Sequence, residues 1–305
     1  MTQPPAPTRA ALLLAFAAVY IIWGSTYLGI RFAIDSIPPL LMAGSRYTLA
    51  GALLYGFMRW RGEPAPTRKG WLTAAVIGVC LLGFGNGGVT LGEQYIPTGL
   101  TALLVATVPM FLAVLGWWSG VAARPRPVVA AGLAAGLAGV YLLARTAGAS
   151  HVAKPGHEGL GIGLVLVAAL VWAIGSLYSK NHQPTPSPFL SGGMQMLCGG
   201  VAMLLVGLLR GEAAGFSLAQ VTATSWLAYA YLVTFGSIVG FTAYIWLLRV
   251  VEPALAGTYA FVNPVVAVLL GWLFLHEVPD PQMLGGAALI VLAVALVVLG
   301  GRGKK

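Results

Sequence analysis

Two long apolar stretches, each with a proline near its middle, constrain the fold of this chain more than any other feature. The first is PTGLTALLVATVPMFLAVLGWW, residues 97–118, and the second is PALAGTYAFVNPVVAVLLGW, residues 253–272. An offset of 155 residues superimposes Pro109 on Pro264. A proline inside a helix removes one backbone donor and frees the carbonyl four residues earlier. Because lipid offers that carbonyl no partner, we assign both prolines to helix breaks and gating around a transporter's central site.

The composition identifies an integral membrane protein. Of the 305 residues, 58% are hydrophobic and only 8% are charged, and the mean hydropathy is +0.87, whereas soluble domains carry about 25% charged residues. A spanning helix needs roughly 20 apolar residues, so ten helices would use about 200 and leave short loops. The expected fold is an all-α polytopic membrane protein with ten transmembrane helices, at roughly 10–32, 40–58, 70–92, 98–119, 127–144, 159–180, 188–209, 224–248, 253–275 and 282–300.

The ten helices are expected to form two repeats of five. The polar stretch 145–158 is the only segment suited to a linker, and it separates a first repeat, residues 1–147, from a second repeat, residues 148–305. Because each repeat has an odd number of helices, the second must enter the membrane from the opposite side. The repeats are therefore inverted, an architecture typical of alternating access between two mirror-related openings.

Shorter matches support the internal repeat. The run GSTY, residues 24–27 in the first helix, matches GSLY, residues 175–178 in the sixth, and Arg46 aligns loosely with Gln195 in the seventh. The offsets differ among the matches, which indicates that loop lengths have drifted between the halves.

The net charge of +9 follows from topology. With the N-terminus inside, twelve of the 17 Lys and Arg residues fall in inner loops and tails, four fall in outer loops and helix ends, and Arg46 lies within a span. This is the positive-inside bias, and it places both termini in the cytoplasm. A nucleic-acid partner is correspondingly disfavoured.

No motif supports enzyme, metal or cofactor chemistry. Cys80 and Cys198 lie inside apolar segments without metal or redox spacing. His276-Glu277 lacks the second histidine of a zinc-protease motif, and no nucleophile elbow or Walker sequence occurs. No carboxylate lies at mid-membrane, so a proton relay is not evident. We expect no enzymatic activity, no cofactor and no metal.

Several runs resemble one known family. They are YIIWGSTY (20–27), AGSRYTLAG (43–51), TALLVATVPMF (101–111) and EPALAGTYAFVNPVVAVLLGWLFLHE (252–277), and they are similar to the EamA family of the drug/metabolite transporter superfamily. The resemblance covers nearly the whole chain. It implies ten helices in a five-plus-five inverted repeat and a basket-like cavity between the halves. It also implies export of small metabolites such as amino acids, as in YddG-type exporters.

Polar and aromatic side chains deep within the spans are the candidates for substrate contact. Amide groups facing hydrocarbon would go unsatisfied, so Asn86 and Asn263 should face a cavity. Aromatic faces can hold an apolar side chain or a cation. The predicted substrate-binding residues are Trp23, Tyr27, Asn86, Trp172, Ser176, Tyr259 and Asn263.

These candidates have competing structural interpretations. Small residues such as Ser176 more often let helices pack closely than bind solutes, and tryptophans can belong to the aromatic belt at the membrane interface. Tyr259 and Asn263 lie four residues apart on one helix face, whereas their counterparts in the fourth helix are apolar, Leu104 and Val108. The site should therefore carry its polar contacts mainly on the second half.

Arg46 is the only formal charge well inside a span. An intramembrane charge is a functional hypothesis by default, but Arg46 lies only about two turns into its helix. The alternative is a structural anchor, bonded to loop carbonyls or to an outer carboxylate such as Asp35, Glu93, Glu277 or Asp280. The sequence favours Arg46 as a structural charge.

The function predicted is secondary transport. A carrier would export small neutral or zwitterionic metabolites across the inner membrane by alternating access, and the expected substrates are amino acids, aromatic, hydrophobic or related. A channel-like facilitator and an integral membrane enzyme acting on lipid are the alternatives. The expected partners are a small-molecule substrate and the lipid bilayer, and a monomer is compatible with the sequence.

Overall fold

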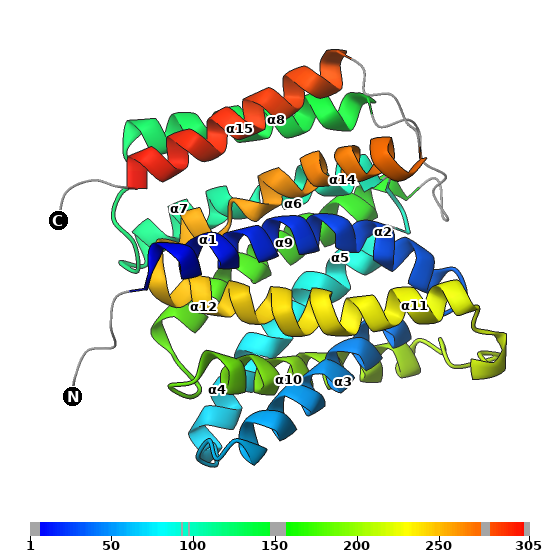
Figure 1. Cartoon of the computed structure of the whole chain (residues 1–305). Helices are drawn as coiled ribbons and strands as arrows, with labels where there is room; N and C mark the ends of the chain where they lie inside the picture. The colour runs from blue at the N-terminus through cyan, green and yellow to red at the C-terminus, as the bar shows by residue number, and fades with distance from the viewer. Residues whose placement is uncertain (1–6, 93, 97, 147–156, 276–280, 302–305) are drawn as a thin grey trace.

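The computed structural model describes residues 7–92, 94–96, 98–146, 157–275 and 281–301, and this part of the chain is helical and contains no strand. Its helices form ten spans (Figure 1). Five spans are single helices: α3 (Pro39–Trp60), α8 (Pro127–Thr146), α9 (Glu158–Asn181), α10 (Pro188–Leu209) and α15 (Pro281–Gly301).

Three spans contain a π-helical segment. The first span is α1 (Arg9–Ala17), η1 (Ala18–Ile22) and α2 (Trp23–Ile34). The third is α4 (Arg68–Gly78), η2 (Val79–Asn86) and α5 (Gly87–Gly92), and the eighth is α11 (Ala223–Tyr231), η4 (Leu232–Phe241) and α12 (Thr242–Val250). Such widened turns are common at functional sites.

The fourth and ninth spans are interrupted. The fourth consists of α6 (Thr98–Val105) and α7 (Val108–Trp118), and the ninth of α13 (Pro253–Ala256) and α14 (Tyr259–Leu275). A short 3₁₀ turn, η3 (Leu218–Gln220), lies in the loop before the eighth span.

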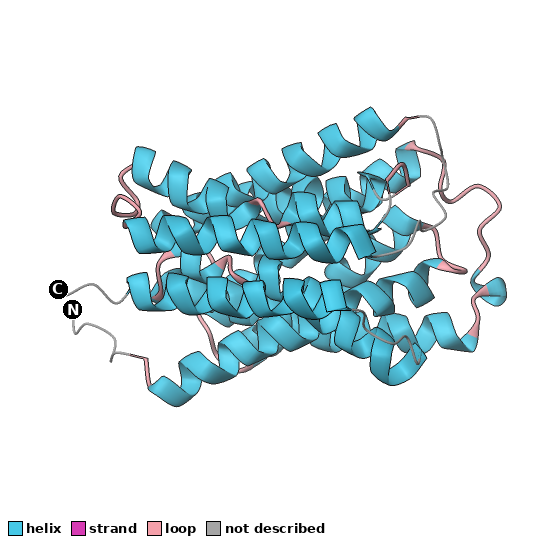
Figure 2. Ribbon diagram, turned by 90° about the horizontal axis from the view of Figure 1, so that it is seen from above, coloured by secondary structure: helices cyan, strands magenta, loops and turns pink. Residues whose placement is uncertain are grey.

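Length and hydropathy agree with a membrane protein. Five spans are both long and apolar enough to cross a bilayer: Arg9–Ile34, Arg68–Gly92, Glu158–Asn181, Pro188–Leu209 and Ala223–Val250. Three shorter apolar segments, Leu103–Trp118, Pro127–Leu142 and Leu284–Val297, belong to the fourth, fifth and tenth spans. Figure 2 shows the spans running alongside one another, with the loops at the two ends of the bundle.

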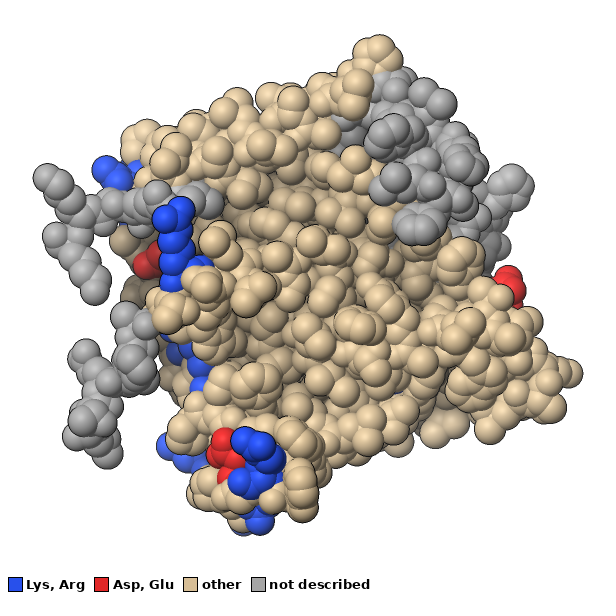
Figure 3. Space-filling model, in the orientation of Figure 1, with Lys and Arg blue, Asp and Glu red and all other residues tan. Residues whose placement is uncertain are grey.

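The two halves run in opposite directions. Helix α1 begins, and α15 ends, at the same end of the bundle (Figure 1), which we call the termini end. The second half begins with α9 at the other end, so the predicted inverted arrangement of two five-helix repeats is confirmed. Lys and Arg side chains gather at the termini end (Figure 3). Those of the described loops and helix ends there are Arg9, Arg59, Arg61, Arg68, Lys69, Arg124, Arg126, Lys180 and Arg249.

Glycines bring the second and seventh spans together. Helix α3 contributes Gly44 and Gly51, and α10 contributes Gly193 and Gly200. A Cβ atom at any of these four positions would lie 2.5–2.9 Å from a backbone nitrogen of the other helix. The two backbones therefore approach as closely as small-residue packing in membranes allows. An offset of 149 relates the two glycine pairs, and the same offset relates Arg46 to Gln195.

The helix breaks lie in different places relative to the two prolines. Pro109 occupies the first turn of α7, two residues after the interruption at 106–107. Pro264, in contrast, lies inside α14, and the ninth span is interrupted earlier, at Gly257 and Thr258. The expectation that Pro264 marks the break in its own span therefore differs from the structure, because a transmembrane helix tolerates a proline where neighbouring groups and small local adjustments satisfy the freed carbonyl.

The interruptions share a threonine. The hydroxyl of Thr107 donates to the carbonyl of Leu104 at 2.6 Å, and the hydroxyl of Thr258 donates to the carbonyl of Leu255 at 2.7 Å. Each of these carbonyls also accepts from the backbone N–H of the same threonine, at 3.1 Å for Leu104 and 3.2 Å for Leu255, so the threonine closes a tight turn at the end of the first helical piece. The breaks therefore correspond through these threonines, at an offset of 151.

Candidate functional site

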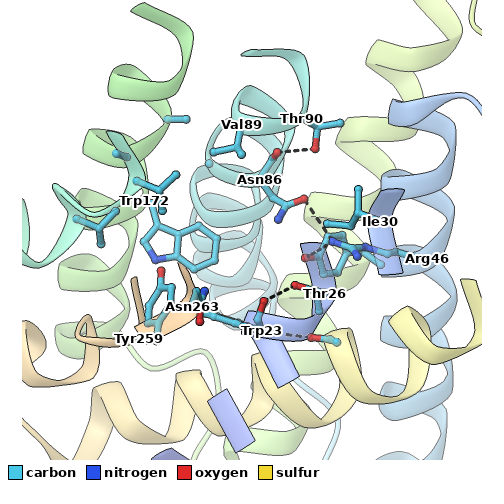
Figure 4. A pocket seen from close by; sticks show the side chains of 17 residues that line it. Trp23, Thr26, Ile30, Arg46, Asn86, Val89, Thr90, Trp172, Tyr259 and Asn263 are labelled. Carbon is cyan, nitrogen blue, oxygen red and sulfur yellow. Dashed lines mark hydrogen bonds between the residues drawn. The ribbon is translucent and has the colours of Figure 1, made fainter. Parts of the chain in front are cut away.

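A cavity of about 100 Å³ lies between the two halves (Figure 4). Both repeats contribute to its wall, the first through α2, α3, the third span and the fourth span, and the second through α9, η4 and α14. Its principal aromatic and polar residues are Trp23, Arg46, Asn86, Trp172, Tyr259 and Asn263. Such a volume has room for about seven to ten water-sized groups, which suits a small solute.

The structure brings together five of the seven predicted binding residues. Trp23, Asn86, Trp172, Tyr259 and Asn263 all line this cavity. They come from four different spans, with Tyr259 and Asn263 both on α14, so the tertiary fold, and no local motif, assembles them.

The remaining two predicted residues are placed differently. Ser176 is fully buried behind the cavity wall, where its hydroxyl donates to the carbonyl of Trp172 at 2.7 Å. It therefore supports the wall, and it does not line the cavity. The Tyr27 side chain lies outside the described residues.

Four aromatic rings form the floor of the cavity. Trp23 meets Tyr259 edge to face with ring centroids 4.7 Å apart, and it meets Trp172 at 5.8 Å. Tyr244 completes the cluster, 5.2 Å from Trp23 and 5.4 Å from Tyr259. Edge-to-face contacts of this kind stabilise a cluster by about 0.5–1.5 kcal/mol per pair.

Tyr244 belongs to the aromatic cluster of the candidate site, although it is not among the residues predicted from the sequence. It is completely buried, and its hydroxyl accepts from Trp172 Nε1 at 3.0 Å and lies 2.7 Å from Ser176 Oγ. Its signal in the sequence was a tyrosine deep inside an apolar span, because a buried phenol needs a hydrogen-bond partner there.

The cavity is closed toward the termini end. From Trp23 it extends along α2 past Thr26 and Ile30, away from that end. On the other side of the aromatic floor, the side chains of Leu177, Leu247 and their neighbours are buried in the apolar core. This conformation therefore seals the cavity from the termini end with aromatic and aliphatic side chains.

Arg46 lies in the wall of this cavity and is 2% exposed. Its Nη2 donates to Tyr47 Oη at 2.8 Å and to Asn86 Oδ1 at 3.4 Å. Its Nε and Nη1 have no hydrogen-bond partner among the described residues. These contacts differ from the expected anchoring to loop carbonyls or to an outer carboxylate. Of the four candidate carboxylates, Glu93, Glu277 and Asp280 lie outside the described residues. A buried cation with free donors favours an anionic group beside it.

Asn263 contributes a hydrogen-bond acceptor to the cavity wall, whereas Arg46 contributes donors. It is 4% exposed, and within the described structure its Oδ1 accepts no hydrogen bond. A buried carbonyl oxygen without a donor is uncommon in native proteins, and such a group calls for an explanation. The wall thus offers free N–H donors from Arg46 and a free acceptor from Asn263, one in each repeat.

No metal chemistry is visible in the part of the chain that the structure describes, where no three His, Cys, Asp or Glu side chains gather. Cys80 and Cys198 are free thiols on separate spans. The chemistry of the cavity is that of hydrogen bonding, one positive charge and aromatic surfaces.

Comparison with known proteins identifies the family. The family model described as "EamA-like transporter family" matches twice, over residues 9–145 and 159–299. The chain belongs to the EamA-like transporter family. It is a membrane transporter built from two EamA repeats. The predicted boundary between residues 147 and 148 falls between the two matches, outside the described residues.

This EamA-like transporter has relatives along nearly its whole length. It is 41% identical over 287 residues to the uncharacterized inner membrane transporter YedA of Escherichia coli (strain K12), covering 94% of this chain and 90% of that protein. It is 26% identical over 298 residues to a probable amino-acid metabolite efflux pump of Salmonella typhimurium, covering 94% of each. A crystal structure superimposes with a TM-score of 0.79 at 20% identity, covering 97% of this chain and 99% of the other, which shows a shared fold.

Proposed function

We propose that this EamA-like transporter is a secondary carrier that exports small neutral or zwitterionic metabolites, amino acids foremost, across an inner membrane. Two relatives support the setting, since one is named an inner membrane transporter and the other a probable amino-acid metabolite efflux pump. The Lys and Arg residues at the termini end support cytoplasmic termini. The cavity then opens away from the cytoplasm.

The observation that carries this proposal is the pair of unpaired groups in the cavity wall. Arg46 Nε and Nη1 have no hydrogen-bond acceptor within the described part of the chain, and a guanidinium fork matches the two oxygens of a carboxylate. Asn263 Oδ1 accepts no hydrogen bond from any residue that the structure describes, and it is suited to an ammonium group. An α-amino acid carries both groups, so its binding would satisfy both buried residues at once.

The aromatic floor suits the side chain of such a substrate. Rings of Trp23, Trp172 and Tyr259 can hold an apolar side chain through contact area or a cation through their faces. A polyanionic sugar phosphate fits poorly, because it needs several cationic partners and Arg46 is the single Lys or Arg among the described residues of the wall. On this proposal Arg46 belongs to the substrate path, in place of the structural role expected from the sequence.

A closed floor favours a carrier over a channel. The four packed aromatic rings and the buried leucines beyond them interrupt any path through the protein. Solute passage therefore requires a second conformation, as the inverted repeats would provide.

Counterflow in proteoliposomes tests the proposal. Vesicles loaded with unlabelled leucine, phenylalanine or threonine should accumulate the labelled amino acid transiently and saturably. Uptake that is linear in concentration and shows no counterflow would favour a facilitator. Release of a modified lipid by the purified protein would favour an enzyme. Failure of every neutral amino acid to exchange, in vesicles shown to contain folded protein, would overturn the substrate class.

A further inference from the structure

Three buried polar side chains in the seventh and eighth spans each have an atom that makes no hydrogen bond within the described part of the chain. Among the described residues, Gln195 Oε1, Ser237 Oγ and Thr242 Oγ1 make no hydrogen bond. Gln195 and Ser237 are completely buried and Thr242 is 5% exposed. Native proteins rarely leave such groups unsatisfied, and the three belong to only two spans, the seventh and the eighth.

The internal repeat relates these residues to the wall of the open cavity. Gln195 lies two residues after Gly193 in α10, as Arg46 lies two residues after Gly44 in α3. Ser237 follows a Phe-Gly pair in the eighth span, as Asn86 follows a Phe-Gly pair in the third. Both of these positions lie in a π-helical segment, η4 and η2.

Thr242 corresponds to Thr90 once one extra residue is allowed between Ser237 and Thr242, where the π-helical turns of η4 continue to Phe241. Thr90 lies four residues after Asn86, and its hydroxyl donates to the Asn86 carbonyl at 2.9 Å. Thr242 lies five residues after Ser237, across a segment where π-helical turns bring positions i and i+5 together. Each pair therefore shares one face of its span.

The correspondence has a consequence for the second conformation. Arg46, Asn86 and Thr90 all line the open cavity. We propose that Gln195, Ser237 and Thr242 form the polar wall of a second cavity, which opens to the termini end when the present one closes. This inference rests on the proposed alternating access and names the residues that would carry its other half. It also explains why these three polar groups are unpaired here, since their partners would be water and solute.

The second wall differs chemically from the first. Gln195 replaces the guanidinium of Arg46 with a neutral amide, and Ser237 replaces an amide with a hydroxyl. It would take neutral hydrogen-bonding groups, and it offers a carboxylate no cation. A zwitterion would therefore be held more weakly by its carboxylate when the protein is open to the termini end.

Cysteine accessibility tests this inference without using a transport assay. In a variant lacking Cys80 and Cys198, we would introduce Ser237→Cys, Thr242→Cys and Thr90→Cys singly, together with Thr234→Cys, which lies on the exposed face of the same π-helical segment. A membrane-impermeant maleimide is then applied to right-side-out and inside-out vesicles. Size-exclusion profiles identify the variants that fold. Two positions in the eighth span are substituted so that the test can still be made if one of the two variants does not fold.

The expected labelling is opposite for the two walls. Cys at 237 and 242 should react from the termini side at least tenfold faster than from the other side, Cys at 90 should react from the other side, and Cys at 234 from neither. No reaction at 237 and 242 from either side, or reaction from the same side as Cys at 90, would overturn the second cavity. If labelling is as expected and no amino acid exchanges, the substrate class fails while the second cavity stands.

Discussion

The indole rings of Trp23 and Trp172 meet edge to face between the two repeats, with centroids 5.8 Å apart and planes at 78°. They are related by the same offset of 149 as Arg46 and Gln195. Each indole also donates to the eighth span, Trp23 to the Gly236 carbonyl at 3.1 Å and Trp172 to the Tyr244 hydroxyl at 3.0 Å. Within the four-ring floor, these two indoles are thus a pair of matching residues from the two repeats, and both are held against the eighth span.

Replacement of Arg46 should lower substrate uptake and leave the folded yield nearly unchanged. Arg46→Lys keeps the charge but loses the planar fork, so uptake of a neutral amino acid should fall about tenfold or more. Folded yield should change little, because the described contacts of Arg46 are a neighbouring tyrosine and one amide. Radiolabelled uptake and size-exclusion profiles measure the two effects. A variant that does not fold would return Arg46 to the structural role.

Replacement of Asn263 should weaken transport with little effect on stability. Its Oδ1 has no partner to lose among the described residues, and Asn263→Ala removes an unsatisfied buried oxygen. We expect unchanged or slightly higher thermal stability in detergent and about a tenfold lower apparent affinity for the amino acid. Unchanged affinity in a folded protein would move the ammonium site elsewhere.

The stability of the protein should depend on the size of the side chain at position 172. The side chain is 8% exposed and packs in the core, so Trp172→Ala should destabilise the protein by about 3–5 kcal/mol and lower its folded yield. Trp172→Phe keeps a ring beside Trp23 but loses the donor to Tyr244, a loss of about 1 kcal/mol. Thermal unfolding of both variants measures whether Trp172→Ala is less stable than Trp172→Phe. Equal stability of the two would contradict the packing of Trp172 described above.

Glycines of α3 offer a matched pair of substitutions. A Cβ at Gly51 would lie 2.6 Å from the Leu197 nitrogen, whereas a Cβ at Gly56 meets nothing within 4 Å. Gly51→Ala should therefore lower the melting temperature sharply, because the α3 and α10 backbones must separate. Gly56→Ala should be neutral or stabilising by up to about 1 kcal/mol, since alanine favours the helix. Comparable losses in both variants would refute the close contact.

The orientation of the bundle can be tested at two exposed loop positions. Ala123 lies in the loop between α7 and α8 at the termini end, and Gln220 lies in the 3₁₀ turn at the other end. In cells expressing the cysteine-free background, Gln220→Cys should react with an impermeant reagent from outside, and Ala123→Cys only after the membrane is opened. The reverse pattern would place the termini outside.

The sequence by itself determined the membrane class, the ten spans and the inverted repeats. Each span can be recognised separately, because the cost of placing polar groups in lipid acts on one segment at a time. Five helices per half then require inversion. Asn86, Trp172 and Asn263 could be named as candidates for the same reason, since a polar or aromatic group deep in a span has few tolerable surroundings.

Only the tertiary structure decided which side chains meet. A soluble helix shows its inner face as an apolar stripe, but spans that are apolar on every side carry no such mark. The sequence therefore does not determine how each helix is rotated about its axis, and the packing of the helices does. Packing turns Arg46 into the cavity wall, places Ser176 behind that wall and puts Tyr244 next to Trp23. The structure likewise places the break of the ninth span at Gly257 and Thr258, while Pro264, the stronger signal in the sequence, lies within a helix.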